Sequence, residues 1–234
     1  DVSLGWGGAL AVWAIPAAIA FVVWLPQVRR LKRSEHIRSF KQALKDLGST
    51  GLAWQVALFM GLQSLTFYVV LAWLPAILMS RGYTSSYSGW MLALSQATGI
   101  LGSLVIPVLA GRRLDQRGIV IALVVAEVVG LAGLLLPQIG WVALWVSILG
   151  FVLGGTFGLA LLLIVVRSST TETATELSGM AQSIGYLVAA TGPFLIGSLF
   201  DFTGEWTYSL LSLLIVALLK LSMGLGAARP ITLD

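Results

Sequence analysis

The sequence predicts an all-α membrane protein with seven transmembrane helices. Its 234 residues are 58% hydrophobic and only 10% charged, and the mean hydropathy is +0.94. A stretch of about twenty apolar residues crosses a hydrocarbon core of about 30 Å when it is helical. Seven such stretches, nearly free of charge, cover residues 4–26, 51–80, 86–111, 118–137, 139–166, 177–200 and 206–228.

The first stretch, 4–26, has an acidic residue before it and basic residues after it. Asp1 precedes it, and Arg29 and Arg30 follow it. A secretory signal peptide has the opposite charge order and a small-residue cleavage site. We therefore expect residues 4–26 to be an internal helix of a longer protein, which makes this chain a fragment or a truncated reading frame.

The second stretch, 51–80, carries polar side chains near its middle. Ser64 and Tyr68 are four residues apart and share one helix face, and Gln63 and Phe67 share the neighbouring face. Amides and hydroxyls are unfavourable against lipid because no water satisfies them there. We expect these side chains to face a wet cavity; the alternative is that they only hold helices together.

Small residues recur every four positions in the third and fifth stretches. The third has Ser95, Gly99 and Ser103, and the fifth has Gly150, Gly154 and Gly158. Such stripes let helix backbones approach closely, so we interpret them as packing surfaces. A cavity floor is the alternative interpretation of the fifth stretch. Because the stripe of the third stretch is interpreted in the same way, Gln96 is a weaker candidate for the cavity.

The fourth and seventh stretches hold the two formal charges found within the spans, Glu127 and Lys220. Both lie roughly 12–14 Å from the same side of the membrane at about 1.5 Å per residue. A lone charge at depth is unfavourable, so the matched depth and opposite sign predict an ion pair. The alternatives are a snorkelling Lys220 beside a protonated Glu127, or Glu127 as a proton-coupling carboxylate.

The sixth stretch has a polar stripe with four-residue spacing, formed by Ser178, Gln182 and Tyr186. Its spacing makes it the expected partner of the polar face on the second stretch. Neither face carries a charged residue. The predicted solute-binding wall is therefore neutral and consists of Gln63, Ser64, Phe67, Tyr68, Gln182 and Tyr186.

The basic residues predict the topology. Most of the 14 Lys and Arg lie in the connections 29–50, 111–118 and 167–176, which alternate along the chain and so share one side. The positive-inside rule places that side in the cytoplasm. We therefore interpret the net charge of +4 as topogenic and expect no nucleic-acid partner. We expect the protein to lie in the plasma membrane of a bacterium, that is, the inner membrane.

Several function classes are disfavoured by what the sequence lacks. It has no cysteine, and its single His36 has no second His at ligand spacing, which argues against a metal site. No nucleotide-phosphate loop is present, and no paired carboxylates or nucleophile constellation occurs within the spans. We expect neither an enzyme nor a bound cofactor.

Three sequence motifs resemble a known family. The loop Gly111-Arg-Arg-Leu-Asp115-Gln116-Arg117-Gly118 is similar to the loop signature G-x-x-x-D-R-x-G-R-[RK] of the major facilitator superfamily, with Gln116 in place of Arg and Ile119-Val120 in place of the basic pair. Residues 61–75 and 177–193 resemble the cyanate permease and 2-nitroimidazole transporter branch of that family.

The resemblance implies a six-helix half of a major facilitator fold, built as a three-plus-three inverted repeat. Residues 1–28 would be the sixth of twelve helices, 29–50 the basic central loop and 51–230 the C-terminal bundle. The expected partners of this chain are then the missing N-terminal half, the lipid bilayer and a small-molecule solute. The implied function is secondary active transport of a small polar or weakly anionic solute by alternating access.

A seven-helix retinal-binding photoreceptor or receptor is the alternative function. A retinal protein needs a lysine in its last span for a Schiff base and a carboxylate counter-ion nearby. Lys220 and Glu127 would supply these groups. Against this alternative, Lys220 lies about two turns from the cytoplasmic end of its span instead of mid-span.

Overall fold

The computed structural model describes residues 6–28 and 47–233, which are almost entirely α-helical. They belong to two units, an N-terminal helical segment and a helical bundle. Residues 29–46 lie outside the described residues, and with them most of the expected central loop, its basic side chains and His36.

The N-terminal segment consists of two helices in sequence, α1 (Trp6–Val12) and α2 (Ala14–Val28). The stretch expected over 4–26 is therefore helical but interrupted at one residue. Pro16 has no N–H to donate to the carbonyl of Val12 four residues earlier, and its ring crowds that carbonyl. The interruption at Trp13 lies at the turn that this proline disturbs.

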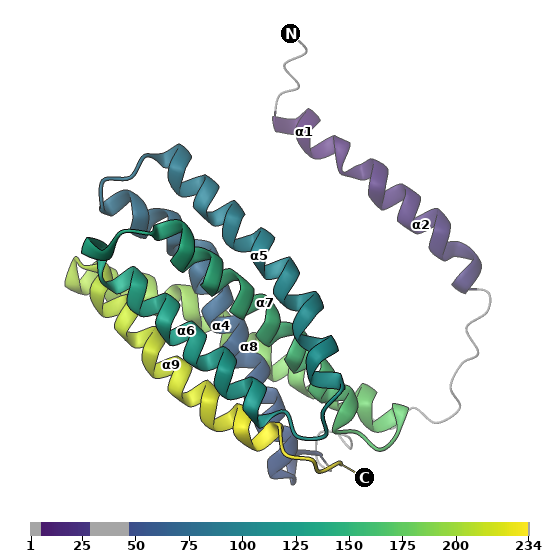
Figure 1. The fold of residues 1–234 in the computed structure, drawn as a ribbon. Coiled ribbons are helices and arrows are strands. Elements are labelled where there is room, and N and C mark those ends of the chain that lie inside the picture. The colour runs from purple at the N-terminus through teal and green to yellow at the C-terminus, as the bar shows by residue number, and fades with distance from the viewer. Residues whose placement is uncertain (1–5, 29–46, 234) are drawn as a thin grey trace. The chain divides into compact units, whose positions relative to one another are not determined.

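The bundle contains six helices that are long and apolar enough to cross a membrane (Figure 1). Short connections join them in sequence, so each returns across the bundle. They are α4 (Gly51–Ser80), α5 (Ser85–Gly111), α6 (Arg117–Leu135), α7 (Val142–Val166), α8 (Thr171–Thr203) and α9 (Trp206–Ala227), with a short 3-10 turn η1 (Pro137–Ile139) before α7.

Helix α8 begins six residues before the apolar stretch expected over 177–200. The hydroxyl of Thr170 accepts a hydrogen bond of 3.1 Å from the backbone N–H of Thr173 and caps the helix. Glu172 in the first turn is favourable at the positive end of the helix dipole. The connection expected over 167–176 is consequently shortened to residues 167–170.

The packing of the bundle has the pattern of an inverted repeat. Helix α5 packs most extensively against α7, and α4 against α8; the pairs α4 with α9 and α6 with α7 come next (Figure 1). Exchanging α4 with α7, α5 with α8 and α6 with α9 converts each of these pairs into another pair of the same set. This is the relation expected of two three-helix repeats.

Buried apolar side chains form two clusters, one toward each end of the bundle. On α4 the first cluster reaches Met60 and the second begins at Leu65. Gln63 and Ser64, which are 1% and 3% exposed, lie at the level between them. The polar part of α4 is therefore placed near the middle of the bundle, away from both ends.

The two intramembrane charges form an ion pair, as the sequence predicts. The Lys220 ammonium contacts the Glu127 carboxylate, and both side chains are completely buried between α6 and α9. Neither group has a further hydrogen-bond partner among the described residues. Lys220 does not snorkel to the surface, and among the described residues each charge is compensated only by the other.

A second buried cation joins the predicted cytoplasmic ends of three elements. Arg167, 3% exposed, follows α7 and donates hydrogen bonds to the carbonyls of Ala227 (3.0 Å) and Ala228 (3.2 Å) at the end of α9. Its guanidinium also donates to the side-chain oxygen of Gln116 in the α5–α6 connection. Burial lowers the pKa of Arg167, and the nearby Asp115 carboxylate opposes this shift.

Gln116 therefore has a structural reason to replace the arginine of the loop signature. Its amide oxygen accepts from Arg167, and its backbone N–H donates to Ala228 at 3.2 Å. An arginine at this position would bring a second cation against the Arg167 guanidinium. The adjacent Asp115 instead accepts from Arg117, which lowers the pKa of that carboxyl group.

The ion pair predicts a charge cycle. We expect Glu127→Gln and Lys220→Met each to lower the free energy of unfolding by about 3–5 kcal/mol, because each leaves a buried charge unpaired. The double variant should recover most of this loss. Unfolding by SDS titration, followed by tryptophan fluorescence, measures all three. Glu205→Gln, which changes an exposed carboxylate before α9, is the control; additive losses in the double variant would contradict the pairing.

The junction around Arg167 predicts a second stability change. Gln116→Arg should lower the free energy of unfolding by at least about 1.5–3 kcal/mol, because it removes a hydrogen bond to a charged group and adds a like charge. Adding Arg167→Gln to that variant should restore much of the loss by exchanging the two groups. Arg112→Gln, on an exposed residue of the same connection, is the control. Wild-type stability of Gln116→Arg would refute this role.

Candidate solute-binding site

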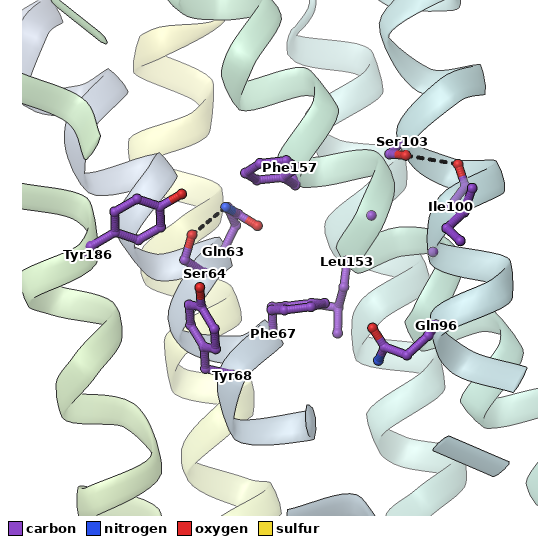
Figure 2. A pocket seen from close by; sticks show the side chains of 12 residues that line it. Gln63, Ser64, Phe67, Tyr68, Gln96, Ile100, Ser103, Leu153, Phe157 and Tyr186 are labelled. Atoms are coloured by element: carbon purple, nitrogen blue, oxygen red, sulfur yellow. Dashed lines mark hydrogen bonds between the residues drawn. The ribbon is translucent and has the colours of Figure 1, made fainter. Parts of the chain in front are cut away.

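A cavity of about 270 Å³ lies between four helices of the bundle. Side chains from α4 and α8 face those from α5 and α7 across it (Figure 2). None of its lining residues is charged. They are Gln63, Ser64, Phe67 and Tyr68 of α4, Gln96, Gly99, Ile100 and Ser103 of α5, Leu153, Gly154 and Phe157 of α7, and Tyr186 of α8.

The amide of Gln63 is held by its own helix. Its Nε2 donates to Ser64 Oγ at 2.6 Å and to Met60 Sδ at 3.4 Å. In the structure the amide NH₂ group faces Met60, whose thioether sulfur can only accept. The carbonyl Oε1 is directed away from these partners and is buried without a hydrogen bond among the described residues (Figure 2).

Two further polar side chains of the cavity, Ser103 and Gln96, have local partners. Ser103 Oγ donates to the carbonyl of Ile100 at 2.8 Å, and Gln96 Nε2 donates to Ser95 Oγ at 3.4 Å. The hydroxyls of Tyr68 and Tyr186 have no hydrogen-bond partner in the part of the chain that the structure describes. Both tyrosines are 41% exposed. The cavity thus offers two tyrosine hydroxyls and one amide carbonyl to a bound molecule.

Aromatic rings form much of the remaining wall. Phe67 and Tyr68 lie edge to face, with ring centroids 5.4 Å apart and an interplanar angle of 75°. Phe157 contributes a ring from α7, and Tyr186 contributes one from α8. Tyr68 and Tyr186 also line a second, apolar cavity of about 500 Å³ with Leu71, Ala72, Ala189, Ala190 and Pro193. Tyr68 and Tyr186 therefore lie at the boundary between the 270 Å³ cavity and the 500 Å³ cavity.

Comparison with known proteins identifies the family. A family model described as Major Facilitator Superfamily matches residues 2–193. The chain belongs to the major facilitator superfamily. Its relatives confirm the resemblance to the cyanate permease and 2-nitroimidazole transporter branch.

Three curated relatives align over nearly the whole of this major facilitator protein, covering 96% of it in each case. It is 40% identical over 226 residues to "Uncharacterized transporter YycB" of Bacillus subtilis. It is 38% identical over 225 residues to "2-nitroimidazole transporter" and 30% over 228 to "Cyanate transport protein CynX", both of Escherichia coli. These alignments cover 56%, 57% and 58% of the relatives, so the chain spans about half their length.

The structure of this major facilitator protein brings five of the six predicted site residues to one cavity. Gln182 does not line it: its amide donates to Ser178 Oγ at 2.7 Å, one turn nearer the predicted cytoplasmic end. Ser178 lines a separate cavity of about 410 Å³ between α7 and α8, together with Thr171 and Thr175. Gln182 thus lies between the two cavities along α8.

Sequence reasoning missed Phe157 and ranked Gln96 too low. Phe157 follows Gly154 by three residues on α7, so helical spacing alone would have placed it beside the glycine stripe. Gln96 precedes Ile100 and Ser103 by one and two turns and lines the same wall.

The retinal-protein alternative is left without support. Lys220 does not line this cavity, because it is fully buried against Glu127, and the family is one of transporters.

The glycine stripes serve both predicted purposes. A Cβ on Gly154 would lie 1.9 Å from the carbonyl oxygen of Gly99, and one on Gly150 would lie 2.0 Å from that of Ser95. Helices α5 and α7 are therefore in backbone contact, as the packing interpretation predicts. Gly99 and Gly154 also line the cavity, so its floor is bare backbone.

These contacts predict that Gly154→Ala destabilises the bundle by about 1–3 kcal/mol or more, because α5 and α7 must separate to admit the methyl group. The free energy of unfolding measures this. Gly179→Ala is a matched control within α8, where nothing lies within 4 Å of the added Cβ. That variant should keep or slightly raise stability, since alanine favours helix by about 0.8–1.0 kcal/mol over glycine. Equal effects of both changes would contradict this account.

Proposed function

We propose that this chain is the C-terminal half of a secondary active transporter that moves a small polar or weakly anionic solute by alternating access. The observation that carries the proposal is a neutral cavity at mid-depth, lined by side chains from both three-helix repeats. Gln63 lies twelve residues after Gly51, about 18 Å along α4 at about 1.5 Å per residue. Solute sites of such transporters lie near the bilayer midplane, at the interface of repeats.

The solute path needs a second wall. We propose that an N-terminal half, corresponding to the part of the relatives that this chain does not span, faces the cavity and alternates access to it. In this scheme residues 1–28 are the sixth of twelve helices, 29–50 are the central loop and 51–230 are the bundle. The connections at 29–50, 111–118 and 167–170 would face the cytoplasm of a bacterial cell, with the bundle in its inner membrane.

The cavity's chemistry supports a small solute with hydrogen-bonding groups. Tyr68 and Tyr186 supply hydroxyls, and Gln63 supplies an acceptor. Gln182, on the predicted cytoplasmic side of Tyr186, would contact the solute as it leaves or reaches the cavity. The names of two relatives, a 2-nitroimidazole transporter and a cyanate transport protein, are consistent with solutes of this size.

The test is transport by the intact protein, with this chain joined to its N-terminal half. We expect Gln63→Ala and Gln182→Ala each to weaken the apparent affinity several-fold, because one uncharged hydrogen bond is worth about 0.5–1.5 kcal/mol. Uptake of labelled 2-nitroimidazole and cyanate into inverted and right-side-out vesicles measures the effect and its direction.

The matched control for this test is Gln55→Ala. Gln55 is on α4 outside the cavity, and its side-chain oxygen accepts from Arg229 at 3.1 Å. Its loss should leave the apparent affinity unchanged. Wild-type transport by both the Gln63 and Gln182 variants would remove these residues from the site, and transport of no small solute would overturn the proposed function.

A further inference from the structure

The chain after α9 turns back and joins the connection between α7 and α8. Its residues 228–233 form a segment that we call the strap. The backbone N–H of Leu233 donates to the carbonyl of Arg167 at 2.7 Å, and the N–H of Ser169 donates to the carbonyl of Leu233 at 3.0 Å. These two hydrogen bonds make a parallel β-bridge between Leu233 and Ser168. The strap is thus attached to the residues that immediately precede α8.

One apolar side chain anchors the far end of the strap. Leu233 is 6% exposed and belongs to the buried cluster toward the predicted cytoplasmic end, whereas Ile231 of the same strap is 45% exposed. The near end is held by the Arg167 guanidinium, which donates to the carbonyls of Ala227 and Ala228. Because the carbonyl of Arg167 also accepts from Leu233, this one residue contacts both ends of the strap.

The first turns of α8 have little other support. Helix α8 begins at Thr171, but its first buried side chain is that of Leu177, so residues 171–176 contribute nothing to the core. Along its length α8 packs chiefly against α4 and makes few contacts with α7 or α9. The connection 167–170 is short, so a strap that fixes Ser169 also fixes the start of α8. The strap is therefore a tertiary contact that holds this end of α8 near α7 and α9.

The same end of α8 forms one wall of the 410 Å³ cavity. Thr171, Thr175 and Ser178 line it from α8, and the remaining wall belongs to α7. Gln182, which we place on the solute path, donates to Ser178 at the inner limit of this wall. A movement of residues 171–176 away from α7 would widen the cavity toward the predicted cytoplasmic side. While it is attached, the strap opposes that movement.

We propose that the strap is a releasable latch on the cytoplasmic end of α8, and that its release lets this end move and the 410 Å³ cavity widen during transport. One buried leucine and two backbone hydrogen bonds attach its far end, which is a small part of the interactions of the bundle, so it can open locally without global unfolding. The role in transport rests on the proposed function, whereas the hold on α8 does not. Every contact of the latch lies within the bundle, so none of them involves the missing N-terminal half.

Hydrogen exchange in the intact transporter, with this chain joined to its N-terminal half, tests the hold on α8. We expect Leu233→Ala to speed exchange in peptides spanning 168–178 by about tenfold or more, because loss of the buried anchor opens the strap more often. Ile231→Ala, on an exposed residue of the same strap, is the matched control and should exchange as the wild type does. Peptides from α4 should be unaffected in both variants, which separates local opening from global unfolding.

A reversible crosslink tests the release. The chain contains no cysteine, and the β-bridge places Ser168 opposite Leu233, close enough for the Cα separation of about 4.4–6.8 Å that a disulfide spans. In the double variant Ser168→Cys and Leu233→Cys, oxidation should lock the strap and a reductant should free it, so one folded protein supplies both states. The locked state should exchange slowly over 168–178 and should take up labelled 2-nitroimidazole or cyanate several-fold more slowly than the reduced state. Ser168→Cys alone is the control and should not respond to oxidation.

The outcomes separate this inference from the proposed function. Wild-type exchange in Leu233→Ala, or failure of the crosslink to form, overturns the inference. Equal uptake by the oxidised and reduced states also overturns it and leaves the proposed function standing, because a solute is then transported without release of the strap. If no solute crosses the membrane in either state, the proposed function fails, and the difference in exchange between the two states decides whether the strap holds α8.

Discussion

Two helix pairs, α5 with α7 and α4 with α8, meet where glycine allows backbone contact, and the walls of the cavity depend on these contacts. Gly154 lies against Gly99 in the first pair, and Gly61 lies against Gly185 in the second. In a bilayer, apolar burial gives little drive for helices to associate, so close packing must supply it. The cavity opens between these two tightly joined pairs.

The dry interior sets a second constraint, which concerns polar groups. Glu127 neutralises Lys220, and Arg167 is surrounded by carbonyl oxygens at the end of α9 together with Gln116. Each of these charges meets either an opposite charge or carbonyl oxygens within the protein, as expected where water is absent. The exception among the cavity residues is the carbonyl of Gln63.

The contribution of α4 was predictable because its four cavity residues, Gln63, Ser64, Phe67 and Tyr68, lie within six positions and helical geometry places them on neighbouring faces. The contribution of α8 was only partly predictable. Spacing put Ser178, Gln182 and Tyr186 on one stripe, but the stripe is longer than the cavity. Tyr186 reaches the cavity, whereas Gln182 bonds to Ser178. Periodicity gives the face of a helix and does not give the depth at which a neighbouring helix meets it.

The sequence by itself determined the apolar spans and the family, because length and local motifs are properties of the chain. It predicted the pairing of Glu127 with Lys220 from their depth and opposite sign, and the structure decided between that pairing and its alternatives. Tertiary structure alone decided that Phe157 and Gln96 join the site, that Arg167 fills the place beside Gln116, and that Oε1 of Gln63 is left without a partner. Each of these depends on which helices pack together and on their relative depth.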